Sequence, residues 1–386
     1  MVTNNYTPYQ GGVVSSINAT VAALQRCGHR VTIITLDFLG EAHQDPAWVI
    51  RLQCPIKFRY KKNHMAIAWR AKKQLRSIIA ALKPDIIHVH HPFFLGYMAA
   101  EIAKSQSIAV IFTYHTIYEA YAHYIPLPEQ LTRPIIRHKV LSFAKQINGI
   151  IAPSTAIQHY LQQMDVKTPV RIIPSSLQDI FFSSKRDVAS ADTAGLHLLT
   201  VGRMVKEKNV EFLLRVAAAL QEAAIDFRFT LIGYGAEYER LQCYAYQELL
   251  LSSDRVVFVH QPSQDMLLEA YQKADIFLFA SQTDTQGLVL AEAMVSGVPV
   301  IALEGPGQRD IIRQGENGFI IADEQAMVAQ IVTLSKNRSL LASLAQGALQ
   351  TGQLYRPENL AQRVTAFYQE IREKRLRFDA KNIENV

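Results

Sequence analysis

The stretch 281–301, SQTDTQGLVLAEAMVSGVPVI, constrains the fold of this chain more than any other. An apolar run, ADIFLFA, precedes it, and a helix-like segment follows Gly287 and stops at a Gly-Val-Pro before a second apolar run, VPVIAL. This order predicts strand, turn, helix and strand, which is one βαβ unit. A helix N-terminus presents unpaired N–H groups and the positive end of the helix dipole, so the turn suits an anionic group such as a phosphate. Two carboxylates, Asp284 and Glu292, bracket the turn and could hold one polar ligand.

The same alternation of short apolar runs and helix-length segments continues along the chain. The first half has PDIIHVHHPF, IAVIFTYHT and INGIIAPS; the second half has LHLLTV, FRFTLIG, VVFVH and NGFII. Such a pattern predicts parallel sheets, whose ligands gather at the carboxyl ends of the strands. A chain of 386 residues is too long for one ordinary core, so we expect two α/β domains with doubly wound sheets. The Ser-rich, aperiodic stretch 171–195 is typical of a linker, which gives an N-terminal domain 1–178 and a C-terminal domain 179–355.

Several candidate ligand-binding residues follow strands. Gly11 and Gly12 stand before a predicted helix, where they let backbone approach a ligand, although a structural turn would also use them. His91 and His115 fall at strand ends, where an imidazole can meet a substrate. His88 and His90 lie two residues apart on a predicted strand, but no third metal ligand is evident near them. The sequence therefore indicates no metal site.

A loop in the second half carries Arg203 and Lys208 just before a predicted helix, which suits a diphosphate. The next strand ends at Gly233 and Gly235, a G-x-G that is weak evidence by itself.

Positive charge is concentrated in one region. Between Asp45 and Asp85 there are ten Lys or Arg and no carboxylate, which favours an anionic partner. The segment 65–83 has helical periodicity, with an apolar stripe for packing and Trp69 among the cations of the opposite face. A Trp flanked by Lys and Arg is typical of a membrane interface; the alternative is a surface Trp covered by another loop, on a solvated basic face. The candidate membrane-binding residues are Trp69, Arg70, Lys72, Lys73 and Arg76.

The sequence also bears on the compartment. It contains no apolar run of about 18 residues and no basic-then-apolar leader at its N-terminus. The three cysteines are scattered without metal-ligand spacing, which is typical of reduced thiols. We therefore expect a cytoplasmic protein.

Taken together, six motifs resemble one family along nearly the whole chain: the retaining glycosyltransferases of the GT-B fold, family four. They are YTPYQGGVVSSI, PDIIHVHHPFFLG, FTYHTIYEAYAHY, VGRMVKEKN, LIGYGAEYERL and TDTQGLVLAEAMVSGVPVIA. The resemblance implies two Rossmann-like domains facing each other across a cleft. It also implies that a C-terminal helix, 356–386, crosses back to the N-terminal domain.

The resemblance implies a role for each matching residue. His115 would lie beside the transferred sugar, and Arg203 with Lys208 would neutralise the diphosphate leaving group. Glu292 would take the ribose hydroxyls. Asp284 stands where the family has a glutamate that orients the donor sugar, and an aspartate reaches about 1.5 Å less, one C–C bond. The other donor-binding positions are Gly11 and Gly12, Gly233 and Gly235, Gln261 near the base, and Gln286, Gly287 and Leu288, whose N–H groups would hold phosphate.

Two loops, FFLG and YHTIYEAYAHYIPLP, resemble the subgroup that glucosylates diacylglycerol. With the basic segment, they predict transfer of glucose from UDP-glucose to diacylglycerol by a protein peripherally bound to the inner face of the cell membrane. No cofactor is obligatory; stimulation by Mg²⁺ and the oligomeric state are left open.

Other functions would fit parts of the sequence. Within the same class, the chain could transfer mannose or another hexose to phosphatidylinositol or a soluble glycan. A sugar-nucleotide epimerase would require acid/base groups able to take a proton from the sugar. A non-enzymatic membrane-surface or nucleic-acid-binding protein would explain the basic stretch alone. Nucleic-acid binding usually brings aromatics interleaved across a charged face, and here the charge is confined to one segment, so no nucleic-acid partner is expected.

Overall fold

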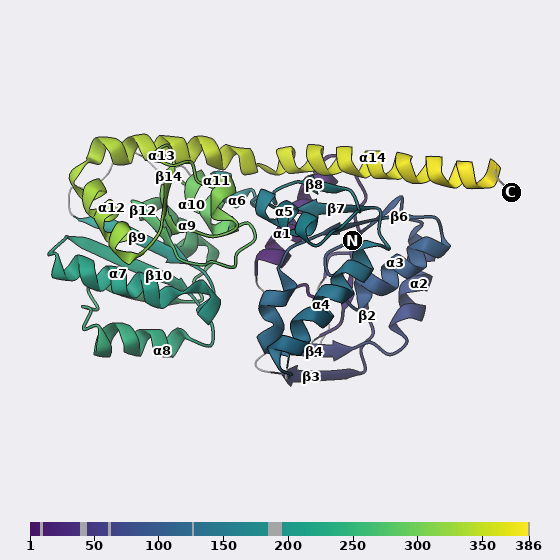
Figure 1. Ribbon diagram of the computed structural model, residues 1–386, viewed down its shortest axis with the longest axis horizontal. Helices are drawn as coiled ribbons and strands as arrows, with labels where there is room; N and C mark the ends of the chain where they lie inside the picture. Colours follow the sequence, from purple (N-terminus) through teal and green to yellow (C-terminus); the bar gives the residue numbers. More distant parts are fainter. Residues whose placement is uncertain (8–10, 39–44, 61–62, 126, 184–194, 385–386) are drawn as a thin grey trace. The chain divides into compact units, whose positions relative to one another are not determined.

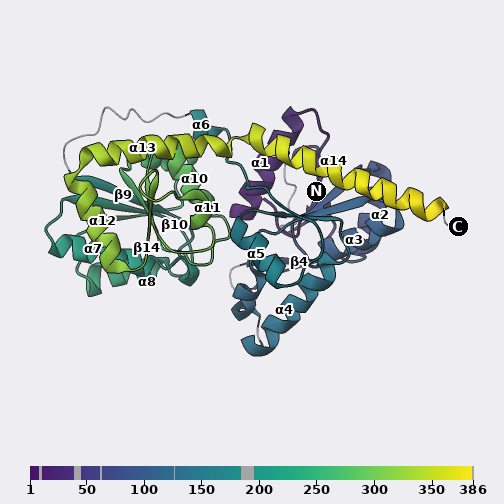
Figure 2. The same cartoon turned by 45° about the horizontal axis from the view of Figure 1, so that its top comes forward.

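A computed structural model describes residues 1–7, 11–38, 45–60, 63–125, 127–183 and 195–384. The chain forms two compact units. The N-terminal unit contains Met1–Ser176 and the chain from Pro357 onward, and the C-terminal unit contains Leu177–Arg356. Each unit is α/β, with a parallel sheet between layers of helices (Figures 1 and 2).

The C-terminal unit has one six-stranded parallel sheet in the order β11-β10-β9-β12-β13-β14. In chain order this is 3-2-1-4-5-6, so the winding reverses between β9 and β12, the point at which doubly wound folds bind ligands. The strands are β9 (Leu196–Val201), β10 (Phe227–Gly233), β11 (Val256–His260), β12 (Ile276–Phe279), β13 (Val300–Leu303) and β14 (Gly318–Ile321).

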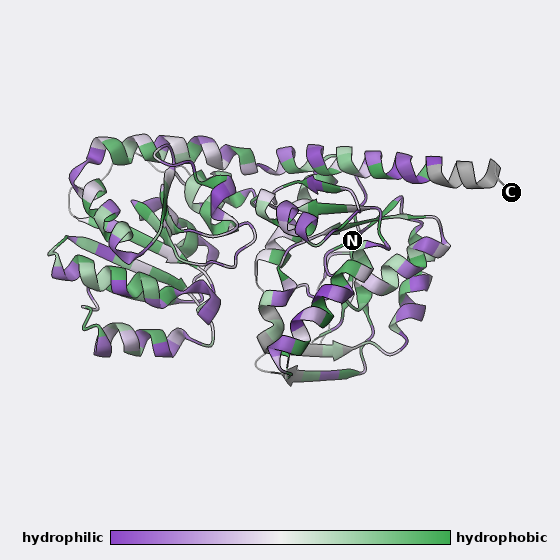
Figure 3. Cartoon of the chain, in the orientation of Figure 1, coloured by the Kyte–Doolittle hydropathy of each residue, from purple (hydrophilic) through white to green (hydrophobic). Residues whose placement is uncertain are grey.

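Alternating strand residues of this sheet bury their side chains on opposite faces. Leu198 packs into one apolar cluster with helices such as α7 and α12, whereas Leu199 packs into a second cluster with α9 and α10. Burial on both faces explains why these strands are nearly continuous apolar runs (Figure 3). The helices are α6 (Ile180–Ser183), α7 (Val210–Glu222), α8 (Tyr238–Cys243), α9 (Gln264–Lys273), α10 (Leu288–Val295), α11 (Gln308–Ile311), α12 (Glu324–Lys336) and α13 (Arg338–Gly352), with short turns η3 (Lys206–Lys208), η4 (Tyr244–Glu248) and η5 (Gln353–Tyr355).

The sheet of the N-terminal unit repeats this order through a minimal first strand. Val2 forms parallel bridges to both Ile34 of β1 and Val89 of β5, so the order is β2-β1-Val2-β5-β6-β7-β8. The segment expected as a first strand is therefore reduced to one bridging residue. The strands are β1 (Ile33–Leu36), β2 (Val49–Leu52), β5 (Ile86–Val89), β6 (Ala109–Thr113), β7 (Gly149–Ala152) and β8 (Val170–Ile172).

One face of this sheet needs the C-terminal helix. Alternate residues such as Ile33 and Ile111 bury against α1 and against Val364 and Phe367 of α14. The helix predicted for the tail thus packs on the N-terminal unit, as the family resemblance implied. The helices are α1 (Gly12–Arg26), α2 (Ala71–Leu82), α3 (Leu95–Ser105), η1 (Tyr118–Tyr124), α4 (Glu129–Ala144), α5 (Thr155–Gln163) and α14 (Pro357–Glu384).

The predicted helix 65–83 is wrong at its start. Asn63–Ile67 forms strand β4, which pairs antiparallel with β3 (Ile56–Tyr60), and helix α2 begins only at Ala71. Pairing with a neighbouring strand overrides the helical periodicity of a short apolar run. Trp69 therefore precedes the helix and does not lie on its outer face, while the predicted apolar stripe holds within α2.

The predicted linker 171–195 includes regular secondary structure. It contains the last two residues of β8 and all of α6, and residues 184–194 lie outside the described part of the chain. Among the described residues, no helix has both the length and the apolar character needed to cross a membrane.

Candidate functional site

The switch point of the C-terminal sheet brings two loops together. Strands β9 and β12 are hydrogen-bonded neighbours, so the loops at their carboxyl ends meet. A hollow of about 280 Å³, part of it open solvent, lies there. Its lining comes from the end of β9 and the following loop (Thr200–Met204), from Lys208 and Val210, and from Phe279 and Ala280 at the end of β12.

Two predicted cations line this hollow, and they differ in whether a carboxylate is paired with them. The side chain of Arg203 makes no hydrogen bond or ion pair with any residue that the structure describes. Lys208, at the end of η3, is paired with Asp284 of the loop after β12: its Nζ lies 2.7 Å from Oδ1 and 2.6 Å from Oδ2. Both side chains of the pair are 19% exposed. The site therefore combines an uncommitted guanidinium with a neutralised ammonium.

Hydrogen bonds hold the loop after β12 in place. Ser281 Oγ donates to the carbonyl of Glu207, which links this loop to η3. Gln308, fully buried, donates from Nε2 to the carbonyls of Ser281 (2.6 Å) and Leu303 (3.1 Å). The backbone positions of Lys208 and Asp284 are thus set from both sides.

The turn that opens α10 has the predicted form. Gly287 has φ 66°, a left-handed conformation that favours glycine, and Leu288 begins the helix. Gly307 approaches this turn so closely that an added Cβ would lie 2.7–2.9 Å from the backbone of Gln286. Sequence reasoning missed Gly307 and Gln308, although the segment GPG after β13 is a turn signal that could have pointed to them.

Glu292 lies on α10 and has one hydroxyl partner. Tyr271 of α9, itself fully buried, donates its hydroxyl to Glu292 Oε2 at 2.8 Å. Burial raises the pKa of Glu292 to about 7, while the hydrogen bond from Tyr271 acts in the opposite direction. Tyr271 was not predicted, because a Tyr on an apolar helix face looks like an ordinary core residue.

The two glycines at the end of β10 have a packing role. A Cβ at Gly233 would lie 1.8 Å from the carbonyl oxygen of Gly202, and one at Gly235 would lie 2.3 Å from that of Met204. Both keep the loop after β10 against the loop that carries Arg203. Gln261, which follows the edge strand β11, is exposed and left-handed, with φ 46°.

In the N-terminal unit, histidines cluster at the ends of β5 and β6. His90 Nδ1 and His115 Nε2 are 2.9 Å apart, and their rings are stacked. Burial lowers the pKa of His115 to about 3, with a further contribution from His91, and lowers the pKa of His91 to about 4. These imidazoles are therefore neutral near pH 7. Each can donate one hydrogen bond and accept another.

His88 is engaged through both ring nitrogens. Nδ1 lies 2.6 Å from the hydroxyl of Tyr368, and Nε2 lies 2.6 Å from that of Thr113. In the part of the chain that the structure describes, no three His, Cys, Asp or Glu side chains are grouped to hold a metal ion.

Gly11 and Gly12 begin α1 in open surroundings. A Cβ added at either position would meet no described atom within 4 Å. Contacts with the described residues thus do not require glycine at this helix N-terminus. The backbone of Gly11, with φ 159°, is a separate reason for glycine at that position.

Comparisons with known proteins agree with this arrangement. A family model for Glycosyltransferase Family 4 matches residues 10–177, and one for Glycosyl transferases group 1 matches residues 183–351. The two matches follow one another along most of the chain. The chain is a glycosyltransferase of the GT-B fold.

Relatives of this glycosyltransferase extend over almost its full length. An alpha-monoglucosyldiacylglycerol synthase from Streptococcus pneumoniae is 28% identical over 95% of this chain and 84% of the relative. A protein of the same name from Acholeplasma laidlawii is 26% identical over 96% of both chains. A GDP-mannose-dependent alpha-mannosyltransferase from Mycobacterium tuberculosis is 25% identical over 83% of this chain and 82% of the relative. The enzyme is thus a hexosyltransferase.

Solved structures share the fold at lower identity. A sucrose-phosphate synthase from Thermosynechococcus elongatus superposes with a TM-score of 0.77 at 20% identity, over 96% of this chain and 98% of that one. HepE from Anabaena, solved in complex with UDP, has a TM-score of 0.75 at 15% identity with the same coverage.

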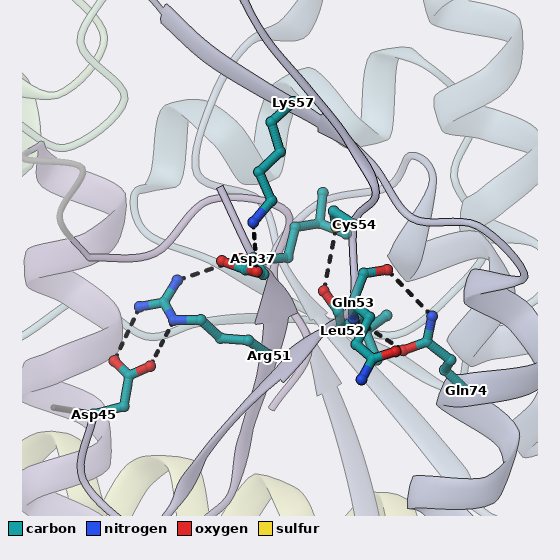
Figure 4. Close-up of polar contacts among 9 residues, drawn as sticks. Asp37, Asp45, Arg51, Leu52, Gln53, Cys54, Lys57 and Gln74 are labelled. Atoms are coloured by element: carbon teal, nitrogen blue, oxygen red, sulfur yellow. Dashed lines mark hydrogen bonds and ion pairs between the residues drawn. The ribbon is translucent and has the colours of Figure 1, made fainter. Parts of the chain in front are cut away.

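The glycosyltransferase neutralises part of its basic stretch with flanking carboxylates. Figure 4 shows Arg51 held by Asp45 and Lys57 held by Asp37, with Nζ to Oδ2 at 2.6 Å in the latter pair. Lys72 pairs with Glu101 at 2.8 Å. Counting charges along the sequence alone therefore overestimates the positive field of this region.

Three of the predicted membrane-binding cations are not paired with a described carboxylate. Arg70, Lys73 and Arg76 are exposed and form no ion pair with any described residue. Trp69 is 67% exposed, so no described loop covers it, contrary to the alternative considered for it.

Proposed function

We propose that this glycosyltransferase moves glucose from UDP-glucose to diacylglycerol, with retention of anomeric configuration, while bound to an anionic membrane surface at the inner face of the cell membrane. The observation that carries the proposal is the near full-length similarity to two alpha-monoglucosyldiacylglycerol synthases. The geometry of each unit is consistent with one half of this reaction.

The C-terminal unit would bind the donor. Arg203 and Lys208 supply two cations at the switch point, and the turn of Gly287 adds the N–H groups at the start of α10. Glu292 would accept hydrogen bonds from the ribose hydroxyls, and Asp284 from the sugar. Two positive groups stabilise the charge that develops on the departing diphosphate.

The reaction would then proceed by attack on the front face of the sugar. The bond between the anomeric carbon and the diphosphate oxygen breaks as the acceptor hydroxyl oxygen bonds to that carbon. The hydroxyl proton passes to the departing diphosphate. Neutral His115 would hold the transferred sugar by hydrogen bonding, since it carries no charge near pH 7.

The N-terminal unit would dock on the membrane through a surface that includes hairpin residues not predicted from the sequence. Ile56 and Phe58 alternate along β3 and are 52% and 45% exposed. Ile56 pairs in register with Ile67, two residues before Trp69. The docking surface is thus an apolar group beside cations that attract anionic headgroups. It consists of Ile56, Phe58, Trp69, Arg70, Lys73 and Arg76.

The reaction is tested with purified protein, radiolabelled UDP-glucose and vesicles that contain diacylglycerol and an anionic phospholipid. We expect label to appear in the lipid extract as an α-glucosyl lipid. If UDP-glucose and the other donors below all leave the lipid extract unlabelled, the lipid acceptor is wrong.

Membrane docking is tested separately by flotation with the same vesicles. The triple variant W69A/K73A/R76A should lose most vesicle binding and keep its affinity for UDP. The matched control R228A/L250A/K336A removes one exposed apolar side chain and two exposed cations from the C-terminal unit. Equal vesicle binding by the triple variant and the control would contradict the assignment.

A second candidate donor is GDP-mannose, favoured by the similarity to the mycobacterial mannosyltransferase. A panel of UDP-glucose, UDP-galactose, GDP-mannose and ADP-glucose separates the options by thermal shift, because only a bound donor stabilises the protein. We expect the largest shift with UDP-glucose.

A further inference from the structure

The charges at the switch point partly satisfy one another. Lys208 directs its ammonium at both carboxylate oxygens of Asp284, at 2.6 and 2.7 Å, in a setting that is four-fifths buried. The ammonium also lies 5.8 Å above the ring centre of Phe279, which closes one side of it. Arg203, which lines the same hollow, has no such partner among the described residues.

We infer that Lys208 and Asp284 form a latch that the donor's diphosphate opens. The inference rests on the proposed function, in which Lys208 binds the diphosphate. An incoming phosphate oxygen competes with Asp284 for the same ammonium, and the carboxylate repels the phosphate. Arg203 makes the first contact because it has no partner to leave among the residues that the structure describes.

Opening the latch links recognition of the phosphate to recognition of the sugar. As long as Lys208 holds it, the Asp284 carboxylate is engaged at both oxygens and cannot accept hydrogen bonds from sugar hydroxyls at full strength. Transfer of Lys208 to the diphosphate frees that carboxylate. The neighbouring backbone stays fixed, because Ser281 is tied to Glu207 and to Gln308, so the change is confined to the two side chains.

The latch predicts an unusual result: removing the charge of a site residue strengthens binding of the product nucleotide. D284N should bind UDP about 10-fold more tightly than wild type, because the competing charge is gone. Its affinity for uridine, which has no phosphate, should be unchanged. Its rate of sugar transfer should fall, since the amide is a weaker acceptor for sugar hydroxyls.

The experiment is isothermal titration of the full chain with UDP and with uridine, at low and high salt. The control D254N makes the same charge change in the turn that precedes β11. This turn lies at the amino end of the strand, whereas Asp284 follows the carboxyl end of β12. D254N should behave as wild type, and the advantage of D284N for UDP should shrink at high salt.

Unchanged or weaker UDP binding by D284N, with uridine binding retained, would overturn the latch. Absence of UDP, GDP and ADP binding by wild type would overturn the donor site and the latch together. Tighter UDP binding by D284N, together with no lipid-extractable product from wild type with any donor, would support the latch and show that only the acceptor assignment is wrong.

Discussion

The two sheets share the strand order 3-2-1-4-5-6, to which the N-terminal unit adds β8, but they differ in the chemistry at their carboxyl edges. In the C-terminal unit this edge carries charged groups: Arg203, Lys208 and Asp284. In the N-terminal unit the corresponding edge carries imidazoles that burial keeps neutral, among them His115. We propose that one fold thus offers a site for an anion in one unit and a site for uncharged hydroxyl groups in the other.

The surfaces of the units differ in the same way. Among the described residues, nine large apolar side chains are exposed in the N-terminal unit and three in the C-terminal unit. The excess fits the proposed contact of the N-terminal unit with lipid.

The largest expected effect comes from removing the uncommitted cation. R203A should lower the rate of sugar transfer by roughly 100-fold and weaken UDP binding, because a donor to the developing charge is lost. Initial rates with labelled donor measure this. K206A changes an exposed lysine in the same loop and should have little effect. Equal losses in both variants would mean that the loop responds to charge in general.

The corresponding change in the N-terminal unit should separate transfer from donor affinity. H115A should reduce kcat roughly 3- to 10-fold, the worth of one hydrogen bond between neutral groups. UDP affinity should stay within a factor of about two, because a neutral imidazole adds no charge to phosphate binding. Rates and titrations on the same preparation check both quantities. If H115A weakens UDP binding and leaves kcat unchanged, the carboxyl edge of the N-terminal sheet takes part in donor binding, which contradicts the role proposed for it.

The raised pKa of Glu292 predicts a pH dependence for nucleoside binding. Only the ionised carboxylate accepts hydrogen bonds from both ribose hydroxyls, so uridine should bind about 10-fold more weakly at pH 6 than at pH 8. NMR titration with uridine avoids any change in a phosphate group. E292Q should bind weakly and without this pH dependence, and a dependence that persists in E292Q would assign it to another group.

The same group affects stability with a defined sign. Its pKa is higher in the folded chain, about 7, than the ordinary value of 4.5, so the folded state binds more protons between these values. Its stabilising contribution is full below about pH 4.5 and is lost as the pH rises through 7. The Tm of wild type should therefore fall from pH 6 to pH 8 relative to that of E292Q.

A smaller change tests Tyr271 as a positioning residue. Y271F removes the hydrogen bond that favours the ionised carboxylate, so the midpoint of uridine binding should move to higher pH. At pH 8 the affinity should drop only a few-fold, by about 1 kcal/mol. An unchanged midpoint would mean that the Tyr271 hydroxyl does not influence the Glu292 carboxylate.

The features of the two units that depend on residues close together in the sequence could be predicted. The βαβ unit at 281–301 appears as β12, α10 and β13, because apolar runs buried on both faces and glycine at a left-handed turn leave clear signals. The cations of the loop after β9 were found from composition and from the family resemblance.

Contacts between distant segments could not be predicted in this way. The Lys208–Asp284 pair joins residues 76 positions apart and exists because β9 and β12 are neighbours in the sheet. The pairs Arg51–Asp45 and Lys57–Asp37 join residues only 6 and 20 positions apart, and they correct the field expected from charge counting. Helix α2 was predicted to begin too early because the alternating residues Ile56–Tyr60, which form the partner strand of β4, were not taken into account.

The central claim is that the charged edge of the C-terminal unit binds the donor's diphosphate. A crystal structure with UDP tests it most directly. We expect the diphosphate to lie within hydrogen-bonding distance of Arg203 and Lys208, with the Lys208 ammonium moved off Asp284 and the ribose on Glu292. A diphosphate held elsewhere, or bound UDP with the Lys208–Asp284 pair intact, would contradict the account.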